Sequence, residues 1–351
     1  MENLASLDNP ALKKFITSLG LPAFRVRQIQ RWIYKRGCGD FDRMSDLSRE
    51  TRSVLADESR IRSIKPVDIR TSSDGTEKYL FRLADGESVE SVLMFEPGRA
   101  TLCVSSQVGC AMGCRFCRTA SLGFRRNLEA HEIVEQALFV RGRLYPNSDI
   151  TNIVLMGMGE PFENFGNVRE ALFRLTSPDY VGLSKRHVTV STSGNADGIR
   201  ELGRTGPDVN LAVSLNATTD EIRSEIMPVN RKYSISELMR ACREFPLGPY
   251  RRITFEYVML RGVNDTEADA MRLIRLIRGI PSKVNLIPFN PFSGARFERP
   301  DDSCVERFQS ILTAGGVSAP VRKSKGMDIA AACGQLKADT EMQASMQSNQ
   351  G

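Results

Sequence analysis

The sequence predicts an α/β protein: an incomplete (β/α) barrel of six parallel strands, preceded by a small helical unit and a short β segment. From about residue 100, short apolar runs alternate with helical stretches, which is typical of β–α units around a parallel sheet. Before residue 65 only helical patterns occur, and Asp-Gly turn signals follow them. Six strands are too few for a closed eight-stranded barrel. We therefore expect an open barrel whose ligands gather at the carboxyl ends of its strands.

The length of the chain allows one full core and a smaller unit. Its 351 residues are 41% hydrophobic and 26% charged, as in ordinary globular proteins. We expect a helical accessory domain over 1–64, a β linker or barrel extension over 65–99, the barrel core over 100–321, a loop with a cysteine over 322–337 and a disordered polar tail over 338–351.

The N-terminal unit should contain three helices with a basic side. Helices are predicted over 10–16, 23–35 and 47–55. In the second helix, Arg27, Arg31 and Lys35 recur every four positions and line one side. The same helix offers Phe24, Ile29, Trp32 and Ile33 for apolar contacts.

The strands follow from apolar and alternating runs. In the β segment, extended runs are separated by turn signals at Asp74-Gly75 and Asp85-Gly86. The expected strands of this segment are 67–72, 78–83 and 87–95. Barrel strands are predicted over 101–106, 152–156, 187–191, 210–215, 253–260 and 283–289, and helices over 130–143, 219–226, 234–244, 266–278 and 303–313.

Basic residues are concentrated in two parts of the chain. The net charge is +6, and residues 1–64 hold twelve Lys or Arg against eight Asp or Glu. More basic residues gather near the cysteines, where they could meet a phosphate backbone or form an ordinary solvated surface. They are Arg115, Arg118, Arg125, Arg126, Arg322, Lys323 and Lys325.

No segment of the sequence indicates export or membrane insertion. The N-terminus lacks a signal-peptide pattern, and no stretch approaches the roughly 18 apolar residues that a membrane span needs. We therefore expect a cytoplasmic protein without membrane association. Eight cysteines are too few for a disulfide scaffold in so long a chain, so a cysteine cluster indicates metal binding or catalysis.

Cys110, Cys114 and Cys117 form such a cluster, spaced C-x3-C-x2-C directly after a strand. Three thiolates this close can hold one side of a 4Fe–4S cubane and leave the fourth iron open. The open iron can bind the methionine part of S-adenosylmethionine. The spacing resembles the radical S-adenosylmethionine (radical SAM) superfamily signature. A zinc site is the alternative, but His131 and His187 are the only histidines and neither has finger-like spacing.

Polar residues at the ends of predicted strands are candidates to bind this ligand. Glu160 could accept hydrogen bonds from an ammonium group, and Gly159 could admit close backbone approach. Ser191, Ser214 and Asn290 could meet ribose, carboxylate or adenine. Each also has a plainer interpretation as a cap or turn residue, with Glu160 exposed on a capped turn.

A larger set of motifs resembles one family within this superfamily. Cys103 and Cys333 lie outside the triad, in TLCVSSQVGC and RKSKGMDIAAACGQL. With GFRRNL, MGMGEP, STSG and LIPFNP, they make residues 20 to 337 similar to the RlmN-type adenine-C2 RNA methyltransferases. The segment LPAFRVRQIQRWIYKRGCGDFDRMSDLSRE resembles that family's accessory RNA-binding domain. The resemblance implies a partial barrel of the radical SAM type, a 4Fe–4S cluster, and 23S rRNA and tRNA as substrates.

The resemblance also implies roles for three residues. Cys333 accepts a methyl group from one S-adenosylmethionine, and a second molecule supplies the radical that activates it, so two are used per turnover. Glu90 is the proton acceptor, and Cys103 is the resolving thiol that forms a disulfide with Cys333. The Gly-rich, basic segment around Cys333 is expected to lower its thiol pKa and let it move.

The remaining implied features are ligand contacts and partners. The family's S-adenosylmethionine contacts fall on Gly159, Glu160, Ser191, Ser214, Leu215, Asn216 and Asn290. Asn216 stands where histidine is usual, and CRTASLGF replaces the usual CxTGxxGF, so we expect altered contacts rather than lost function. A flavodoxin-type electron donor, a thiol reductant and a monomeric state are also expected.

Three other functions stay open from the sequence. One is the related antibiotic-resistance activity that methylates carbon 8 of the same rRNA adenine; GFRRNL and the full N-terminal domain favour carbon 2. A second is a non-catalytic, zinc-stabilised RNA-binding protein. The third is a glycyl-radical activase, which would share the triad but has no need of Cys103 and Cys333.

Overall fold

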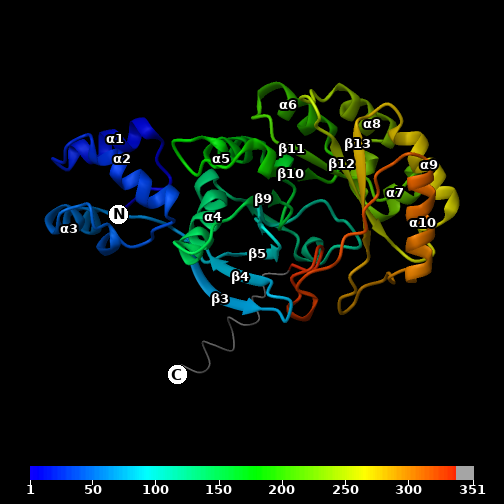
Figure 1. Cartoon of the computed structure of the whole chain (residues 1–351), viewed down its shortest axis with the longest axis horizontal. Helices are drawn as coiled ribbons and strands as arrows, with labels where there is room; N and C mark the ends of the chain where they lie inside the picture. The colour runs from blue at the N-terminus through cyan, green and yellow to red at the C-terminus, as the bar shows by residue number, and fades with distance from the viewer. Residues whose placement is uncertain (337–351) are drawn as a thin grey trace.

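The computed structural model describes residues 1–336, in which helices surround one large sheet (Figure 1). The expected tail over 338–351 and residue 337 lie outside the described residues. The N-terminal unit stands at one end of the molecule, and the barrel occupies the rest (Figure 1).

The N-terminal unit contains the three predicted helices, α1 (Asn9–Ser18), α2 (Arg25–Gln30) and α3 (Arg49–Glu58). Asp8 caps α1 by accepting a hydrogen bond from the Ala11 N–H at 2.8 Å, and Ser48 caps α3 through the Thr51 N–H at 3.2 Å. A π-helical turn, η1 (Arg31–Lys35), continues α2, so the predicted helix ends where expected but changes its hydrogen bonding. A short 3-10 turn, η2 (Phe41–Arg43), and the paired strands β1 (Glu2–Asn3) and β2 (Ser59–Arg60) complete the unit.

The two sides of the second helix largely follow the prediction. Arg27, Arg31 and Lys35 are exposed, while Ile29 and Ile33 are buried. The expectation for Phe24 is wrong, because its side chain is 60% exposed and lies under the Arg25 guanidinium, 4.8 Å from the ring centre. The ring precedes the helix and therefore does not share the buried face.

Buried charged side chains attach the N-terminal unit to the barrel. Glu135 is fully buried and accepts hydrogen bonds from Asn3 Nδ2 at 2.7 Å and from the N–H groups of Ser63 and Ile64 at 2.7 and 3.0 Å. Arg174 donates to the carbonyl of Ala5 at 2.8 Å. Because these groups are removed from water, they fix the unit against the barrel.

One nine-stranded sheet forms the centre of the chain, in the order β13-β12-β11-β10-β9-β6-β5-β4-β3. The strands from β6 to β13 in this sheet pair in parallel and form the six predicted barrel strands, whereas β3, β4 and β5 extend the same sheet antiparallel. The bounds are β3 (Lys65–Thr71), β4 (Glu77–Arg82), β5 (Ser88–Glu96), β6 (Arg99–Cys103), β9 (Asn152–Leu155), β10 (Val188–Thr192), β11 (Asn210–Ser214), β12 (Ile253–Met259) and β13 (Ser282–Pro288).

Helices cover the parallel part of the sheet, as expected for β–α units (Figure 1). Two of them, α5 and α6, were not singled out from the sequence. The helices are α4 (Ala130–Leu144), α5 (Phe165–Thr176), α6 (Ala196–Thr205), α7 (Asp220–Ile226), α8 (Ile235–Glu244), α9 (Glu267–Ile277) and α10 (Asp302–Ala314). In α6, Gly198 packs so closely on Phe162 that a Cβ would lie 2.4 Å from that side chain, which explains a glycine inside the helix.

Short elements outside the main sheet frame the cysteine motif. Strands β7 (Gln107–Gly109) and β8 (Phe124–Asn127) pair antiparallel on either side of it, and a 3-10 turn, η3 (Arg118–Leu122), follows the last cysteine. Residues 322–336 run back across the open end of the barrel and include the 3-10 turn η7 (Met327–Ile329) (Figure 1).

Candidate active site

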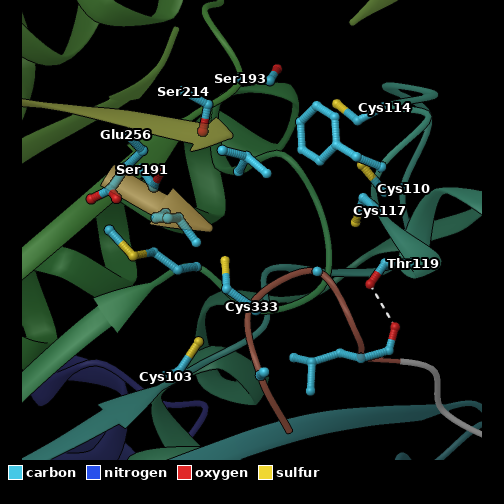
Figure 2. Close-up of a pocket in the computed structure, with 18 of the residues that line it drawn as sticks. Cys103, Cys110, Cys114, Cys117, Thr119, Ser191, Ser193, Ser214, Glu256 and Cys333 are labelled. Carbon is cyan, nitrogen blue, oxygen red and sulfur yellow. Dashed lines mark hydrogen bonds between the residues drawn. The ribbon is translucent and has the colours of Figure 1, made fainter. Parts of the chain in front are cut away.

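A cavity of about 180 Å³ lies at the carboxyl ends of the parallel strands, where an incomplete barrel is expected to bind its ligands. Its walls come from β5, the ends of β6 and of β9 to β13, the cysteine loop, and parts of the C-terminal segment 322–336. Figure 2 shows how the side chains of these segments face one another.

All five cysteines singled out from the sequence line this one cavity. Cys110, Cys114 and Cys117 lie together on one side, and Cys103 and Cys333 lie across from them (Figure 2). Cys103 ends β6, and Cys333 belongs to the C-terminal loop. The fold therefore brings the two separate thiols to the same place as the triad.

The three cysteines of the motif lie together at the cavity, as the ligands of one iron–sulfur cluster would. In residues 1–336, no group of three or more His, Cys, Asp or Glu side chains is placed to hold one metal ion. A cubane cluster makes a different demand, because each cysteine binds a different iron atom. Burial raises the pKa of the Cys110 thiol to about 12 and that of Cys114 well above its usual value, so both need the positive charge of iron to become thiolates.

Glu160 lies deep in the cavity wall rather than on an exposed turn. The residue is 2% exposed, and its carboxylate accepts hydrogen bonds from the Ser193 N–H at 2.6 Å and the Phe162 N–H at 3.2 Å. Burial raises its pKa, and the Ser193 N–H opposes that rise. Gly159 has φ +105°, and a Cβ there would lie 2.6 Å from Gln107 Cβ. Position 159 therefore requires a glycine because Gln107 packs directly against its backbone.

The other predicted ligand contacts divide into two groups. Ser191, Ser214, Asn216 and Asn290 line the cavity from the ends of β10, β11 and β13. Asn216 has a left-handed backbone, φ +56°, and its Oδ1 accepts a hydrogen bond from the Val258 N–H at 2.8 Å. The oxygen of its amide is therefore already bound to the backbone of β12. Leu215 is not among the lining residues, because its side chain is buried in the barrel core.

Comparisons with known proteins agree with this geometry. The Ribosomal RNA large subunit methyltransferase N-terminal domain family matches residues 2–61, and the Radical SAM superfamily matches residues 104–274. Curated dual-specificity RNA methyltransferases RlmN from Pelobacter propionicus and Anaeromyxobacter dehalogenans are each 50% identical to this chain. The alignments cover 95% and 96% of the chain, and 95% and 92% of the relatives. The chain belongs to the RlmN family.

A solved structure supports the same family at the level of the fold. The crystal structure of a radical SAM methyltransferase from Sphaerobacter thermophilus has a TM-score of 0.91 and 44% identity, and the match covers 97% of this chain and 100% of that one. The predicted partial barrel of the radical SAM type is confirmed. Membership in the RlmN family implies a 4Fe–4S cluster and S-adenosylmethionine, for which the cavity offers the residues described above.

Glu90, the expected proton acceptor of this RlmN-family chain, is buried in β5 and is not among the residues that line the cavity. It is 3% exposed and forms an ion pair with Lys78 at 3.1 Å. Val92 and Met94, on the same face of β5 by the two-residue period of a strand, line the cavity. The sequence places Glu90 in the predicted strand 87–95, and its burial and its cation partner come from the tertiary structure.

Three functional candidates escaped sequence reasoning or were placed differently by it. Arg223 is fully buried on α7 and donates hydrogen bonds to the carbonyl groups of Ser193, Ser214 and Leu215 at 2.7, 3.1 and 3.0 Å. It thereby fixes the ends of β10 and β11. Nothing in the sequence distinguishes it from the chain's many other arginines.

Glu256 and Arg322 complete the side of the cavity near Cys103 and Cys333. Glu256 is 5% exposed; Asn285 Nδ2 donates to its Oε1 at 2.9 Å, while Oε2 has no hydrogen-bond partner in the described part of the chain. In the sequence, Glu256 could have been recognised as the single acidic residue in the otherwise apolar strand ITFEYVML. Arg322, which the sequence grouped with residues facing a phosphate backbone, instead lines the cavity. Its backbone lies beside β13, where the Arg322 N–H donates to the Leu286 carbonyl at 2.8 Å.

The expected low pKa of Cys333 is also corrected. Cys333 is exposed in the open cavity, yet the protein packed around the thiol raises its pKa, and the nearby positive charge of Arg322 opposes the rise without reversing it. Burial likewise raises the pKa of the Cys103 thiol to about 12, again with Arg322 opposing. The desolvation by the enclosing protein outweighs the basic charge that the sequence made visible.

Proposed function

We propose that this chain methylates carbon 2 of an adenine in 23S rRNA and in tRNA, through Cys333 and Cys103. The observation that carries the proposal is the shared cavity: both thiols face the same space as the three cysteines of the radical SAM motif. The curated relatives are named dual-specificity RNA methyltransferases RlmN. An enzyme limited to forming a radical would need the triad alone.

The bound 4Fe–4S cluster and S-adenosylmethionine would supply a methyl donor and a radical able to attack an electron-poor ring carbon. Within that chemistry Cys333, as thiolate, takes up the methyl group, whose carbon then joins the adenine. Glu90 accepts the ring proton. The Cys103 thiolate attacks the Cys333 sulfur, so the bond from that sulfur to the new carbon breaks and a disulfide forms. The released carbon keeps the bonding electron pair and takes up a proton to become the methyl group, and the unpaired electron left by the radical addition would return to the cluster.

The cavity residues would hold the ligand in place for these steps. Glu160 and the strand-end residues Ser191, Ser214, Asn216 and Asn290 would contact S-adenosylmethionine, while Gly159 keeps the turn beside Gln107. Cys110, Cys114 and Cys117 would hold the cluster. Arg322 would stabilise both reacting thiolates, because its positive charge opposes the rise in the pKa of each thiol.

The partners follow from the same chemistry. The disulfide requires a thiol reductant, and the cluster requires an electron donor of the flavodoxin type. The target base has to leave its stack to reach the cavity, as base-modifying enzymes generally require. No helix within residues 1–336 has the length and apolar character to cross a membrane. We infer a monomeric enzyme that works in the cytoplasm, where thiols stay reduced.

The test replaces each reacting thiol in anaerobically reconstituted enzyme supplied with rRNA. Cys103→Ala should accumulate protein covalently bound to RNA, because nothing releases the base from Cys333. Cys333→Ala should give neither product nor crosslink. Cys304→Ala, which removes a thiol outside the cavity, is the matched control and should turn over normally. Normal turnover by Cys103→Ala, or 8-methyladenosine as the nucleoside product in mass spectrometry, would overturn the proposal.

A further inference from the structure

The loop that carries Cys333 is held by two different parts of the chain. Close to Cys333, the Arg118 N–H donates to the Gly334 carbonyl at 2.7 Å, and Thr119 Oγ1 donates to the Leu336 carbonyl at 2.7 Å (Figure 2). Farther upstream, the loop contacts the turn between β3 and β4, residues 72–76, beside which it runs in Figure 1.

Two carboxylates make the upstream contact, one from each side. Asp328 of the loop accepts hydrogen bonds from Ser72 Oγ at 2.5 Å and from the Ser73 N–H at 3.0 Å. Asp74 of the turn accepts from the Gly326 N–H at 3.1 Å. Each segment thus supplies both an acceptor and donors to the other, as a specific docking contact requires.

The contact is more than a property of Asp-Gly turns. The next hairpin turn has the same internal hydrogen bond, from the Glu87 N–H to Asp85 Oδ1 at 3.0 Å, as the Thr76 N–H makes to Asp74 Oδ1 at 2.9 Å. The second oxygen of Asp85 instead binds Arg126. In Asp74, one oxygen therefore shapes the turn, and the other is available to the loop.

The docked loop has a fixed path toward Cys333. Gly326 and Ala330 both have left-handed backbones, with φ +63° and +51°, and Lys78 Nζ donates to the Ala330 carbonyl at 3.4 Å. Ala330 is not glycine, so this conformation needs the surrounding contacts to maintain it. Cys333 follows three residues later.

In this docked position the loop also occupies the amide of Asn290. Asn290 Nδ2 donates to the Cys333 carbonyl at 3.3 Å, and Asn290 Oδ1 accepts from Ser324 Oγ. Both polar atoms of the side chain are then bound to the loop. A ligand that needs the same amide has to displace at least one of these hydrogen bonds.

We propose that Asp74 and Asp328 are positioning residues that dock the Cys333 loop on the β3–β4 turn, and that the docked loop competes with S-adenosylmethionine for Asn290. The second half rests on the proposed function, in which Asn290 contacts that ligand. Docking holds Cys333 in the cavity, and undocking frees the amide for the ligand. The two segments therefore couple the position of the thiol to occupancy of the ligand site.

The first test measures the loop without any need for turnover. Asp74→Asn keeps the acceptor for the Thr76 N–H and retains an Asn-Gly turn, but it can place an amide NH2 opposite the Gly326 N–H. Hydrogen exchange over residues 322–336 should become about tenfold faster, as expected for the loss of a hydrogen bond to a charged group. Asp328→Asn should act in the same way. The matched control Asp85→Asn should leave this exchange rate unchanged.

The second test measures ligand binding to the anaerobically reconstituted protein by calorimetry. If the loop competes for Asn290, Asp74→Asn should bind S-adenosylmethionine severalfold more tightly, while kcat falls because Cys333 is less well placed. Unchanged hydrogen exchange in both variants would overturn the docking role. Faster exchange with unchanged or weaker ligand binding would overturn the competition. The RNA crosslink of Cys103→Ala is independent of these outcomes, so failure of the proposed function remains distinguishable.

Discussion

Replacing Arg223 by methionine tests whether a buried cation holds the strand ends of the active site. Methionine is similar in length and apolar but has no hydrogen-bond donor. The substitution leaves the carbonyl groups of Ser193, Ser214 and Leu215 without this donor, and it also deprives Asn230 Oδ1 of a donor at 2.9 Å. The perturbation therefore acts on the backbone beside the expected ligand contacts.

The magnitude follows from two opposing effects. Loss of four buried hydrogen bonds to a charged donor costs about 1.5 kcal/mol each, or about 6 kcal/mol in all. Burial lowers the pKa of Arg223 to about 10, which corresponds to a cost of about 3 kcal/mol for keeping the guanidinium charged in the folded state. The substitution relieves that cost. The free energy of unfolding should therefore fall by about 3 kcal/mol.

Urea unfolding followed by circular dichroism measures this change. With a denaturant dependence of about 3 kcal/mol per molar urea, the midpoint should fall by about 1 M. The control Arg240→Met removes an arginine that is 63% exposed and pairs with Glu237 only at 3.8 Å, so its midpoint should hardly move. If the two variants unfolded at the same urea concentration, Arg223 would not hold the strand ends in the way argued.

Three further predictions concern single groups. Burial raises the pKa of Glu256, so the stability of the folded state falls as pH rises through that pKa. Glu256→Gln should therefore raise Tm by about 2 °C at pH 7.5, and near pH 4, where the carboxyl is protonated, this gain in Tm should disappear. Gly159→Ala places a Cβ 2.6 Å from Gln107 Cβ and should cost about 2 kcal/mol in urea unfolding, whereas Gly166→Ala, with open space around it, should not destabilise the fold. Burial raises the pKa of Asp74, but hydrogen bonds from Thr76, Gly326 and Ser72 outweigh it and lower the pKa to about 2. The contact between Asp74 and the Cys333 loop should therefore persist from pH 8 down to pH 4 and weaken below pH 4, as measured by hydrogen exchange of the loop.

The outcomes that would contradict these predictions are specific. An equal Tm for Glu256→Gln and the parent at pH 7.5 would show that the carboxyl is not penalised by burial. Equal stabilities of Gly159→Ala and Gly166→Ala would mean that the Gln107 contact yields without cost. Loop exchange that accelerates already between pH 8 and pH 6 would require a titrating group other than Asp74.

The sequence determined the cofactor chemistry and most of the fold because both depend on local patterns. The spacing of Cys110, Cys114 and Cys117 places three thiols within reach of one cluster regardless of distant contacts. Alternating apolar and helical runs likewise predicted the six parallel strands, since the apolar residues of these strands are buried and helices cover the sheet. The sequence motifs around Cys103 and Cys333 indicated the family without any knowledge of the cavity.

Only the tertiary structure decided which remote groups meet and what their surroundings do to them. Sheet order and the path of the C-terminal loop bring Cys103 and Cys333 into one cavity, turn Arg322 inward, and dock Asp328 on the β3–β4 turn. The sequence misjudged the Cys333 pKa because it shows nearby charge but not desolvation, which depends on every segment packed around the thiol. Spacing along the chain sets local reach, whereas burial and long-range contacts arise only when all segments pack together.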